Sequence, residues 1–93
     1  AGKQLPAGGH KLLGDLNRGA GDAQRALSEY ELERAASGES ADLAAGMALA
    51  AEFLGQSDVA IERWNKVMEL DPNNRDARTH LRKLRQPVPG RRR

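Results

Sequence analysis

The sequence contains no cysteine and few aromatic residues. The absence of cysteine excludes disulfide bonds and thiolate metal sites, and it leaves the compartment open. Aromatic residues make up only 3%, whereas Ala, Leu and Glu are abundant, so the composition favours helices over a β-sandwich. No stretch approaches the ~20 apolar residues of a membrane-spanning helix, and no signal-peptide pattern opens the chain.

The length of 93 residues predicts one small domain. The chain begins with Ala rather than Met, which we expect of a processed chain or a piece of a longer one. Charge is distributed unevenly: residues 1–81 carry nine basic and 13 acidic side chains, whereas residues 82–93 carry six basic ones and no acid. The pI of about 9.4 therefore reflects the C-terminal end.

An internal repeat of about 34 residues organises the chain. A glycine, a small residue, an aromatic residue and a large-small pair recur at this offset: Gly55, Ala60, Trp64 and Met47-Ala48 fall on Gly21, Ala26, Tyr30 and Leu13-Gly14. Turn and cap residues (Pro6, Gly19 to Gly21, Asp22, Ser40, Gly55, Pro72 and Asn74) divide the chain into helices. They predict an all-α fold of five helices, over about residues 7–18, 23–36, 41–54, 57–70 and 75–86.

The repeated helix pair resembles the tetratricopeptide repeat (TPR) family. The second copy matches its pattern better, with the pair Met47-Ala48, the turn glycine Gly55, the small Ala60, the aromatic Trp64 and a closing Leu-Asp-Pro-Asn-Asn at 70–74. The first copy departs from the pattern at Glu33, where a small residue is usual, and at Gly38, where proline is usual. Both departures bear on how tightly the second helix ends.

The resemblance implies an α-solenoid of antiparallel helix pairs that form a right-handed superhelix. We expect an N-terminal extension at 1–6, repeats at about 7–40 and 41–74, a capping helix at about 75–86, and a basic disordered tail at 87–93. Arg82 stands where the first two copies have Gly14 and Ala48, so no further helix can approach closely and the array is expected to stop there. About three repeats are usually needed for a stable array, and this chain has two. We therefore expect one of three situations: the capping helix supplies the missing stability, the domain dimerises, or the chain is cut from a longer array.

The resemblance also implies a non-enzymatic protein-interaction module, an adaptor, scaffold or assembly factor, that binds a peptide or helix of a partner in a concave groove. Its bacterial members with a similar composition suggest a role in assembly or biogenesis, in the cytoplasm or the periplasm. The first helix of each pair would line the groove, with Leu12, Leu49 and Phe53 among mixed charges that suit an apolar segment beside a basic residue. Alternatively, Leu49 and Phe53 pack between adjacent helices. The expected groove residues are Lys11, Leu12, Asp15, Arg18, Asp42, Ala45, Leu49, Glu52, Phe53, Asp76, Thr79, His80 and Lys83.

One subclass of the family clamps the terminal carboxylate of chaperone tails with two lysines, two asparagines and an arginine. Of these positions only Lys11 matches. Asp15 and Gly46 replace the asparagines, while Asp76 and His80 replace the second lysine and the arginine. Since two aspartates would repel an acidic tail, a chaperone tail is disfavoured as a partner.

Residues for catalysis or for binding a metal or cofactor do not converge in the sequence. His10 is expected to be a half-buried structural residue, and His80 a groove residue whose ring is mainly solvated. No carboxylate stands at ligand spacing around either histidine, and the serines fall at caps and turns. We therefore expect no enzyme, no cofactor and no metal.

Two alternatives to the interaction module remain. The chain could be a structural or self-associating piece of a larger complex. Its basic tail could instead bind nucleic acid or an acidic membrane surface, although the tail has no aromatic residue to stack on bases, so a specific nucleic-acid role is disfavoured.

Overall fold

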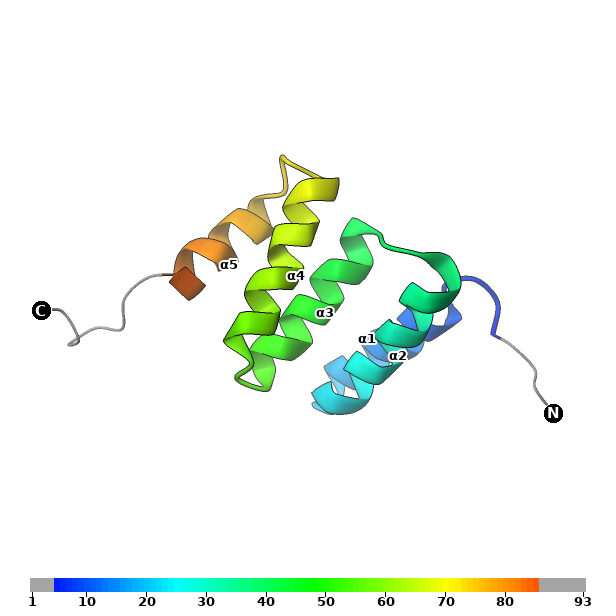
Figure 1. The fold of residues 1–93 in the computed structure, drawn as a ribbon. Coiled ribbons are helices and arrows are strands. Elements are labelled where there is room, and N and C mark those ends of the chain that lie inside the picture. Colours follow the sequence, from blue (N-terminus) through cyan, green and yellow to red (C-terminus); the bar gives the residue numbers. More distant parts are fainter. Residues whose placement is uncertain (1–4, 86–93) are drawn as a thin grey trace, which may run out of the picture.

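The computed structural model describes residues 5–85, which form five α-helices and, within that range, no strand. The helices are α1 (Gly9–Gly19), α2 (Ala23–Ser37), α3 (Ala41–Phe53), α4 (Ser57–Leu70) and α5 (Arg75–Arg85). Each helix runs roughly antiparallel to the one before it (Figure 1). The predicted all-α class is confirmed, whereas the predictions for the first four residues and for the tail lie outside the described residues.

Side-chain caps begin three of the helices, as the sequence predicts. Asp22, Ser40 and Asn74 stand directly before α2, α3 and α5. Each side-chain oxygen accepts a hydrogen bond from the backbone N–H three residues further on, at 3.1, 3.1 and 2.8 Å respectively. These bonds satisfy N–H groups that have no partner within the helix, so the caps determine where the helices begin.

Helix α1 begins at Gly9, two residues later than predicted. Gly8 adopts a left-handed conformation with φ of 86°, and Gly9 N–H donates to the carbonyl of Pro6 at 2.8 Å. The chain therefore makes a turn at the position where the sequence predicts the first helical residues. Gly8 also has no side chain to cap the helix, and so the cap must come from elsewhere.

Glu33 of α2 supplies that cap. Glu33 is only 6% exposed. Its carboxylate accepts hydrogen bonds from the backbone N–H groups of Gly8, His10 and Lys11 at 3.0, 3.1 and 3.2 Å. The hydroxyl of Ser37 and these N–H groups lower the pKa of Glu33 below its ordinary 4.5. Helix α2 continues past Glu33 to Ser37. The departure from the repeat pattern therefore ties α2 to the start of α1 and leaves the end of α2 intact.

The core consists of two apolar clusters that share α3. One joins α3, α4 and α5 around Trp64, and the other joins α2 and α3 around Tyr30. Because α3 is buried on both sides, it is the central element of the molecule. Helices α1 and α5 lie toward opposite ends of the described part of the molecule (Figure 1).

Two glycines make room for Tyr30, which is fully buried between α1 and α3. A Cβ atom at Gly14 would lie 2.5 Å from Cε1 of Tyr30, and one at Gly46 would lie 2.7 Å from its Cζ. Neither distance is sterically possible, so both positions require glycine unless the ring moves. Trp64, which stands one repeat after Tyr30, lies in the other cluster with Ala48 and Leu81.

Candidate protein-interaction site

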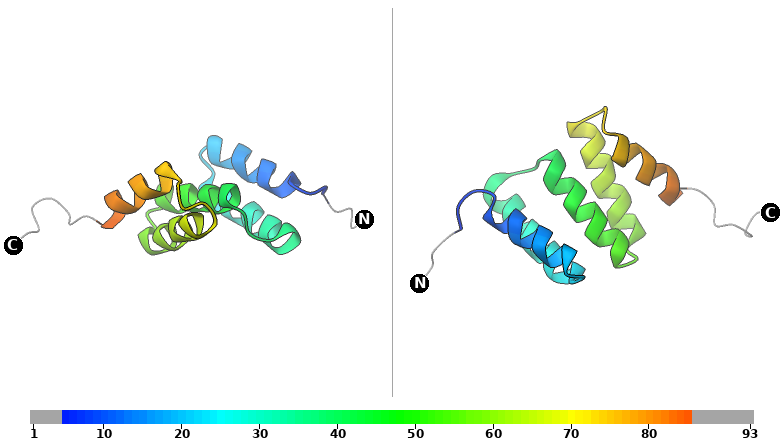
Figure 2. Two further views of the ribbon diagram at one scale, coloured as in Figure 1. Left: turned by 90° about the horizontal axis from the view of Figure 1, so that it is seen from above. Right: turned by 180° about the vertical axis from the view of Figure 1, so that it is seen from behind.

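The residues expected to form the site come from α1, α3 and α5. Seen from above, these three helices lie along one side of the molecule and α2 and α4 along the other (Figure 2). The structure therefore brings the three helices that carry the expected residues to one side, which we call the α1/α3/α5 face. Its eight principal candidates are Lys11, Leu12 and Asp15 on α1, Asp42, Leu49, Glu52 and Phe53 on α3, and His80 on α5.

The apolar candidates differ in exposure. Phe53 is 69% exposed and Leu12 is 59% exposed, although both side chains are large and apolar. Leu49 is partly buried and packs against the cluster around Trp64. The alternative interpretation, in which Leu49 and Phe53 pack between adjacent helices, therefore fits Leu49 but does not fit Phe53.

The charged candidates on α1 hold Tyr30. The hydroxyl of Tyr30 donates to Asp15 at 2.6 Å and accepts from Nε of Arg18 at 3.0 Å, while Nζ of Lys11 donates to Asp15 at 2.7 Å. Burial raises the pKa of Tyr30 to about 12. Burial also raises the pKa of Asp15, but the hydrogen bonds from Lys11 and Tyr30 and the charges of Lys11 and Arg18 outweigh it, so that pKa ends below 3.8. Lys11, Asp15 and Arg18 are thus engaged within the protein.

A second network holds Trp64. Its indole N–H donates to Oε2 of Glu52 at 2.6 Å, and Nδ1 of His80 lies 2.6 Å from the same oxygen. The His80 ring stacks on Trp64 with 4.5 Å between ring centroids. The expectation of a mainly solvated His80 ring is therefore wrong: a carboxylate from α3 and an indole ring from α4 hold the imidazole on α5. No sequence spacing around His80 reveals Glu52, which is 28 residues away.

In both networks, the residue at the same position of the repeat forms a hydrogen bond with the buried aromatic residue. Arg18 and Glu52 each stand 12 residues before the aromatic residue that they bind. The phenol oxygen of Tyr30 accepts from the donor Arg18, and the indole N–H of Trp64 donates to the acceptor Glu52. This spacing was available in the sequence and could have indicated that Arg18 and Glu52 serve the core. The exposed members of the face, Leu12, Asp42 and Phe53, take no part in these networks.

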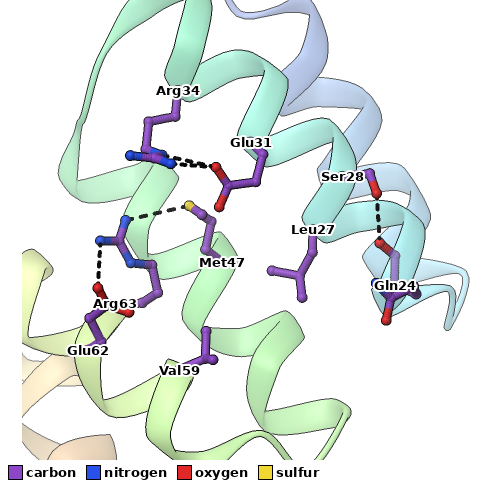
Figure 3. Close-up of a pocket in the computed structure, with 9 residues that line it drawn as sticks. All are labelled: Gln24, Leu27, Ser28, Glu31, Arg34, Met47, Val59, Glu62 and Arg63. Carbon is purple, nitrogen blue, oxygen red and sulfur yellow. Dashed lines mark hydrogen bonds and ion pairs between the residues drawn. The ribbon is translucent and has the colours of Figure 1, made fainter.

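A groove of about 460 Å³ lies on the opposite side, between α2 and α4. Leu27, Met47 and Val59 lie at its centre, the charged residues gather toward one end, and Gln24 and Ser28 lie at the other (Figure 3). No residue pattern in the sequence predicts this groove. It forms only where α2 and α4 flank Met47 of α3, and no motif in the sequence indicates that arrangement.

The charges around this groove are paired within the protein. Arg63 is only 8% exposed, and its Nη1 donates to both carboxylate oxygens of Glu39 at 3.2 and 3.3 Å and contacts the sulfur of Met47 at 3.7 Å. Arg34 pairs with Glu31 at 2.6 Å (Figure 3). What the groove offers to a partner is therefore mainly its apolar centre, formed by Leu27, Met47 and Val59.

Each histidine pairs with one glutamate, His10 with Glu29 at 2.7 Å and His80 with Glu52. Within residues 5–85, no three side chains of the types that bind metals come together in a group that could hold an ion. None of the described helices is both long enough and apolar enough to cross a membrane.

Comparison with known proteins identifies no relative: no protein-family model matches the chain, and no curated protein matches it in sequence.

Proposed function

We propose that the chain is a TPR-like α-solenoid, with two helix pairs and a capping helix in a right-handed superhelix. Recurring contacts support this architecture. Tyr30 fits against Gly46 of the following helix, and Trp64 stacks on His80, which stands one repeat after Gly46. Arg18 and Glu52 likewise serve equivalent aromatic residues from equivalent positions. A pattern of contacts that recurs from one copy to the next is typical of stacked structural repeats.

The function that we propose is non-enzymatic protein binding: the chain is an adaptor, scaffold or assembly factor that takes up an apolar or amphipathic segment of a partner on the α1/α3/α5 face. The observation that carries this proposal is the exposure of Phe53, which ends α3 and is 69% exposed in a chain with only three aromatic residues. Exposed aromatic anchors contribute much of the free energy of binding in protein interfaces. The exposed carboxylate of Asp42 suits a basic residue in the partner segment.

The test is an affinity capture with the whole chain as bait, followed by mass spectrometry, in which Phe53→Ala is compared with Val59→Ala. Val59 is the matched control because it is also an exposed apolar residue, but lines the groove between α2 and α4. The proposal predicts that Phe53→Ala loses the captured partner and that Val59→Ala retains it. The reverse result would assign binding to the groove, and a partner retained by both variants would contradict the α1/α3/α5 face.

A second candidate function, self-association within a larger complex, is favoured by the outer side of α1. Leu13 and Leu16 are 37% and 62% exposed, whereas Met47 and Ala50, their equivalents in the second repeat, are buried in the cluster with α2. In the repeat register, α1 therefore exposes apolar side chains where α3 is covered by a preceding helix.

Light scattering over a range of protein concentrations tests this second candidate. Self-association through α1 predicts a mass that rises with concentration in the wild type and not in Leu16→Gln. A monomer at every concentration would remove the support for self-association without affecting the proposal for Phe53.

A further inference from the structure

The outward side of α5 carries four exposed arginines, which we call the arginine stripe: Arg75, Arg78, Arg82 and Arg85. Their spacing of i, i+3, i+7 and i+10 places them within an arc of about 80° on an α-helix. None of the ion pairs between residues 5–85 involves these arginines. Arg78 and Arg85 donate only to uncharged oxygens, those of the Pro72 carbonyl and the Asn65 amide. Residues 1–4 and 86–93 contain no Asp or Glu that could pair with them.

The position of the stripe in the repeat register is informative. The equivalent residues one repeat earlier, on α3, are all alanines: Ala41, Ala44, Ala48 and Ala51. Ala44, Ala48 and Ala51 are fully buried in the cluster with Trp64 and Val67 of α4, and Ala41 packs against that cluster. The stripe therefore occupies the side of α5 that corresponds to a helix–helix interface in the preceding pair, with arginine in place of alanine throughout.

Helix stability does not explain this arrangement. Arg82 and Arg85 lie in the last turn, where positive charge is favourable, but Arg75 is the first residue of the helix, where positive charge opposes the helix dipole. All three neighbouring pairs of the stripe are like charges at i, i+3 or i+4, which destabilise a helix. A helix face that only contacts solvent could carry both acidic and basic side chains and so avoid the repulsion between like charges. A ligand of opposite charge removes it.

We propose that the arginine stripe is a docking surface for an acidic helix of a partner protein, with carboxylates at i, i+3 or i+4, and i+7. Such a helix presents its carboxylates at a rise of about 4.5–6 Å, the same as that of the arginines. The planar guanidinium group binds a carboxylate through two parallel hydrogen bonds, which a lysine cannot do. The proposal goes beyond the proposed function, since it concerns a different surface and a partner of the opposite charge.

The charge of the remaining surface favours a short acidic helix over nucleic acid. Residues 5–74 carry 12 acidic and six basic side chains, so a polyanion that extends from α5 over the other helices meets repulsion. An acidic helix of about three turns, roughly 16 Å long, matches the stripe, which spans about 15 Å. The stripe also has no aromatic side chain on which bases could stack.

The test uses a fluorescent, alanine-rich peptide of roughly 14 residues with glutamates at i, i+4, i+7 and i+11 along one side of its helix. Fluorescence anisotropy measures its Kd for the whole chain, for Arg82→Glu and for Arg25→Glu. Arg25 is the matched control, because it is an exposed arginine of α2 outside the described ion pairs. We expect roughly tenfold weaker binding for Arg82→Glu and a change of less than about twofold for Arg25→Glu. Phe53→Ala should bind the peptide like the wild type, so this test is independent of the proposed function.

Several results would overturn the proposal. One is an equal loss for Arg82→Glu and Arg25→Glu, and another is equal binding of a peptide whose glutamates are scrambled around the helix. If an oligonucleotide of equal charge bound more tightly through the same arginines, the stripe would be a nucleic-acid site. If light scattering revealed a salt-sensitive dimer that Arg82→Glu abolishes, a second copy would be the occupant. Circular dichroism melting checks that Arg82→Glu folds like the wild type. If it does not, the binding measurement is made with the milder variant Arg78→Gln.

Discussion

At the scale of single residues, Tyr30 and Trp64 show how this chain builds a core with few aromatic side chains. Both rings are fully or almost fully buried, and the polar atom of each finds a partner on the helix before it. A buried phenol or indole without such a partner would lose free energy on folding. Arg18 and Glu52, which the sequence suggested for partner binding, are therefore first of all components of the core.

The space that Tyr30 occupies leads to a prediction for Gly14. In Gly14→Ala the new methyl group meets the Tyr30 ring, which its hydrogen bonds to Asp15 and Arg18 hold in place, so we expect the free energy of unfolding to fall by about 1–3 kcal/mol. Gly19→Ala is the control on the same helix, because a Cβ atom there meets nothing within 4 Å. Urea unfolding of both variants provides the measurement. Equal stabilities would mean that α1 and α2 are not packed as described.

Glu33 gives a prediction with a definite pH dependence. Its pKa is lowered in the folded state, so its contribution to stability is fully present above its ordinary value of 4.5 and is lost as the pH falls through the folded-state pKa. Glu33→Gln should therefore lower Tm at neutral pH, and its difference from the wild type should shrink on acidification to about pH 3. Thermal melting of both proteins over this range is the measurement. The exposed Glu62→Gln serves as the control, and a pH-independent difference for Glu33→Gln would contradict the capping role.

At the scale of helices, the elements differ in how many sides they bury. Helix α3 contributes seven buried residues and contacts α2 and α4 on different sides, whereas α5 buries only Ala77 and Leu81. Local stability is expected to follow this order, since elements with few buried apolar contacts open more readily. Helix α5 is held in addition by His80, through the stack on Trp64 and the bond to Glu52.

Leu81→Ala tests how α5 is attached. We expect a loss of about 2–4 kcal/mol, because the truncated side chain leaves a cavity in the cluster around Trp64. Hydrogen exchange should show the amides of α5 losing protection before those of α3. Leu70→Ala, in an exposed position of α4, should change little. If the exchange order were reversed, α5 would not be the weakly attached element.

At the scale of the whole molecule, the shared helix α3 couples the two apolar clusters. Separate helix pairs could unfold one by one, but here the cluster around Tyr30 and the cluster around Trp64 both require residues of the same helix, α3. Disruption of either cluster removes support from the other. The net charge, in contrast to the core, separates along the chain: α5 is strongly basic, and residues 5–74 are acidic overall.

This coupling predicts cooperative unfolding. The single tryptophan reports only on the cluster of α3, α4 and α5, whereas far-UV circular dichroism reports on all helices. Because α3 belongs to both clusters, the two signals should give the same midpoint and the same slope in urea. A fluorescence transition that precedes the circular dichroism transition would show that the two halves unfold separately.

The helical class, the five helices between residues 5 and 85 and most of their ends could be predicted from the sequence alone. It could do so because these features depend on neighbouring residues: Asp22, Ser40 and Asn74 cap the helices that follow them, and Pro72 cannot continue α4. The repeat spacing likewise placed the candidate residues on α1, α3 and α5, the three helices that lie on one side of the molecule. These are local or periodic properties, which a single chain displays directly.

Which of these residues are exposed and which are bound within the protein depends on how the helices pack. Glu33 caps a helix that begins before it in the chain, Glu52 holds Trp64 and His80 together, and Phe53 stays exposed. The groove beside Arg63 exists only because α2 and α4 flank α3. The bonds of Glu33 to the start of α1 and of His80 to Glu52 join residues 22 to 28 positions apart in the chain, and no local pattern determines those contacts.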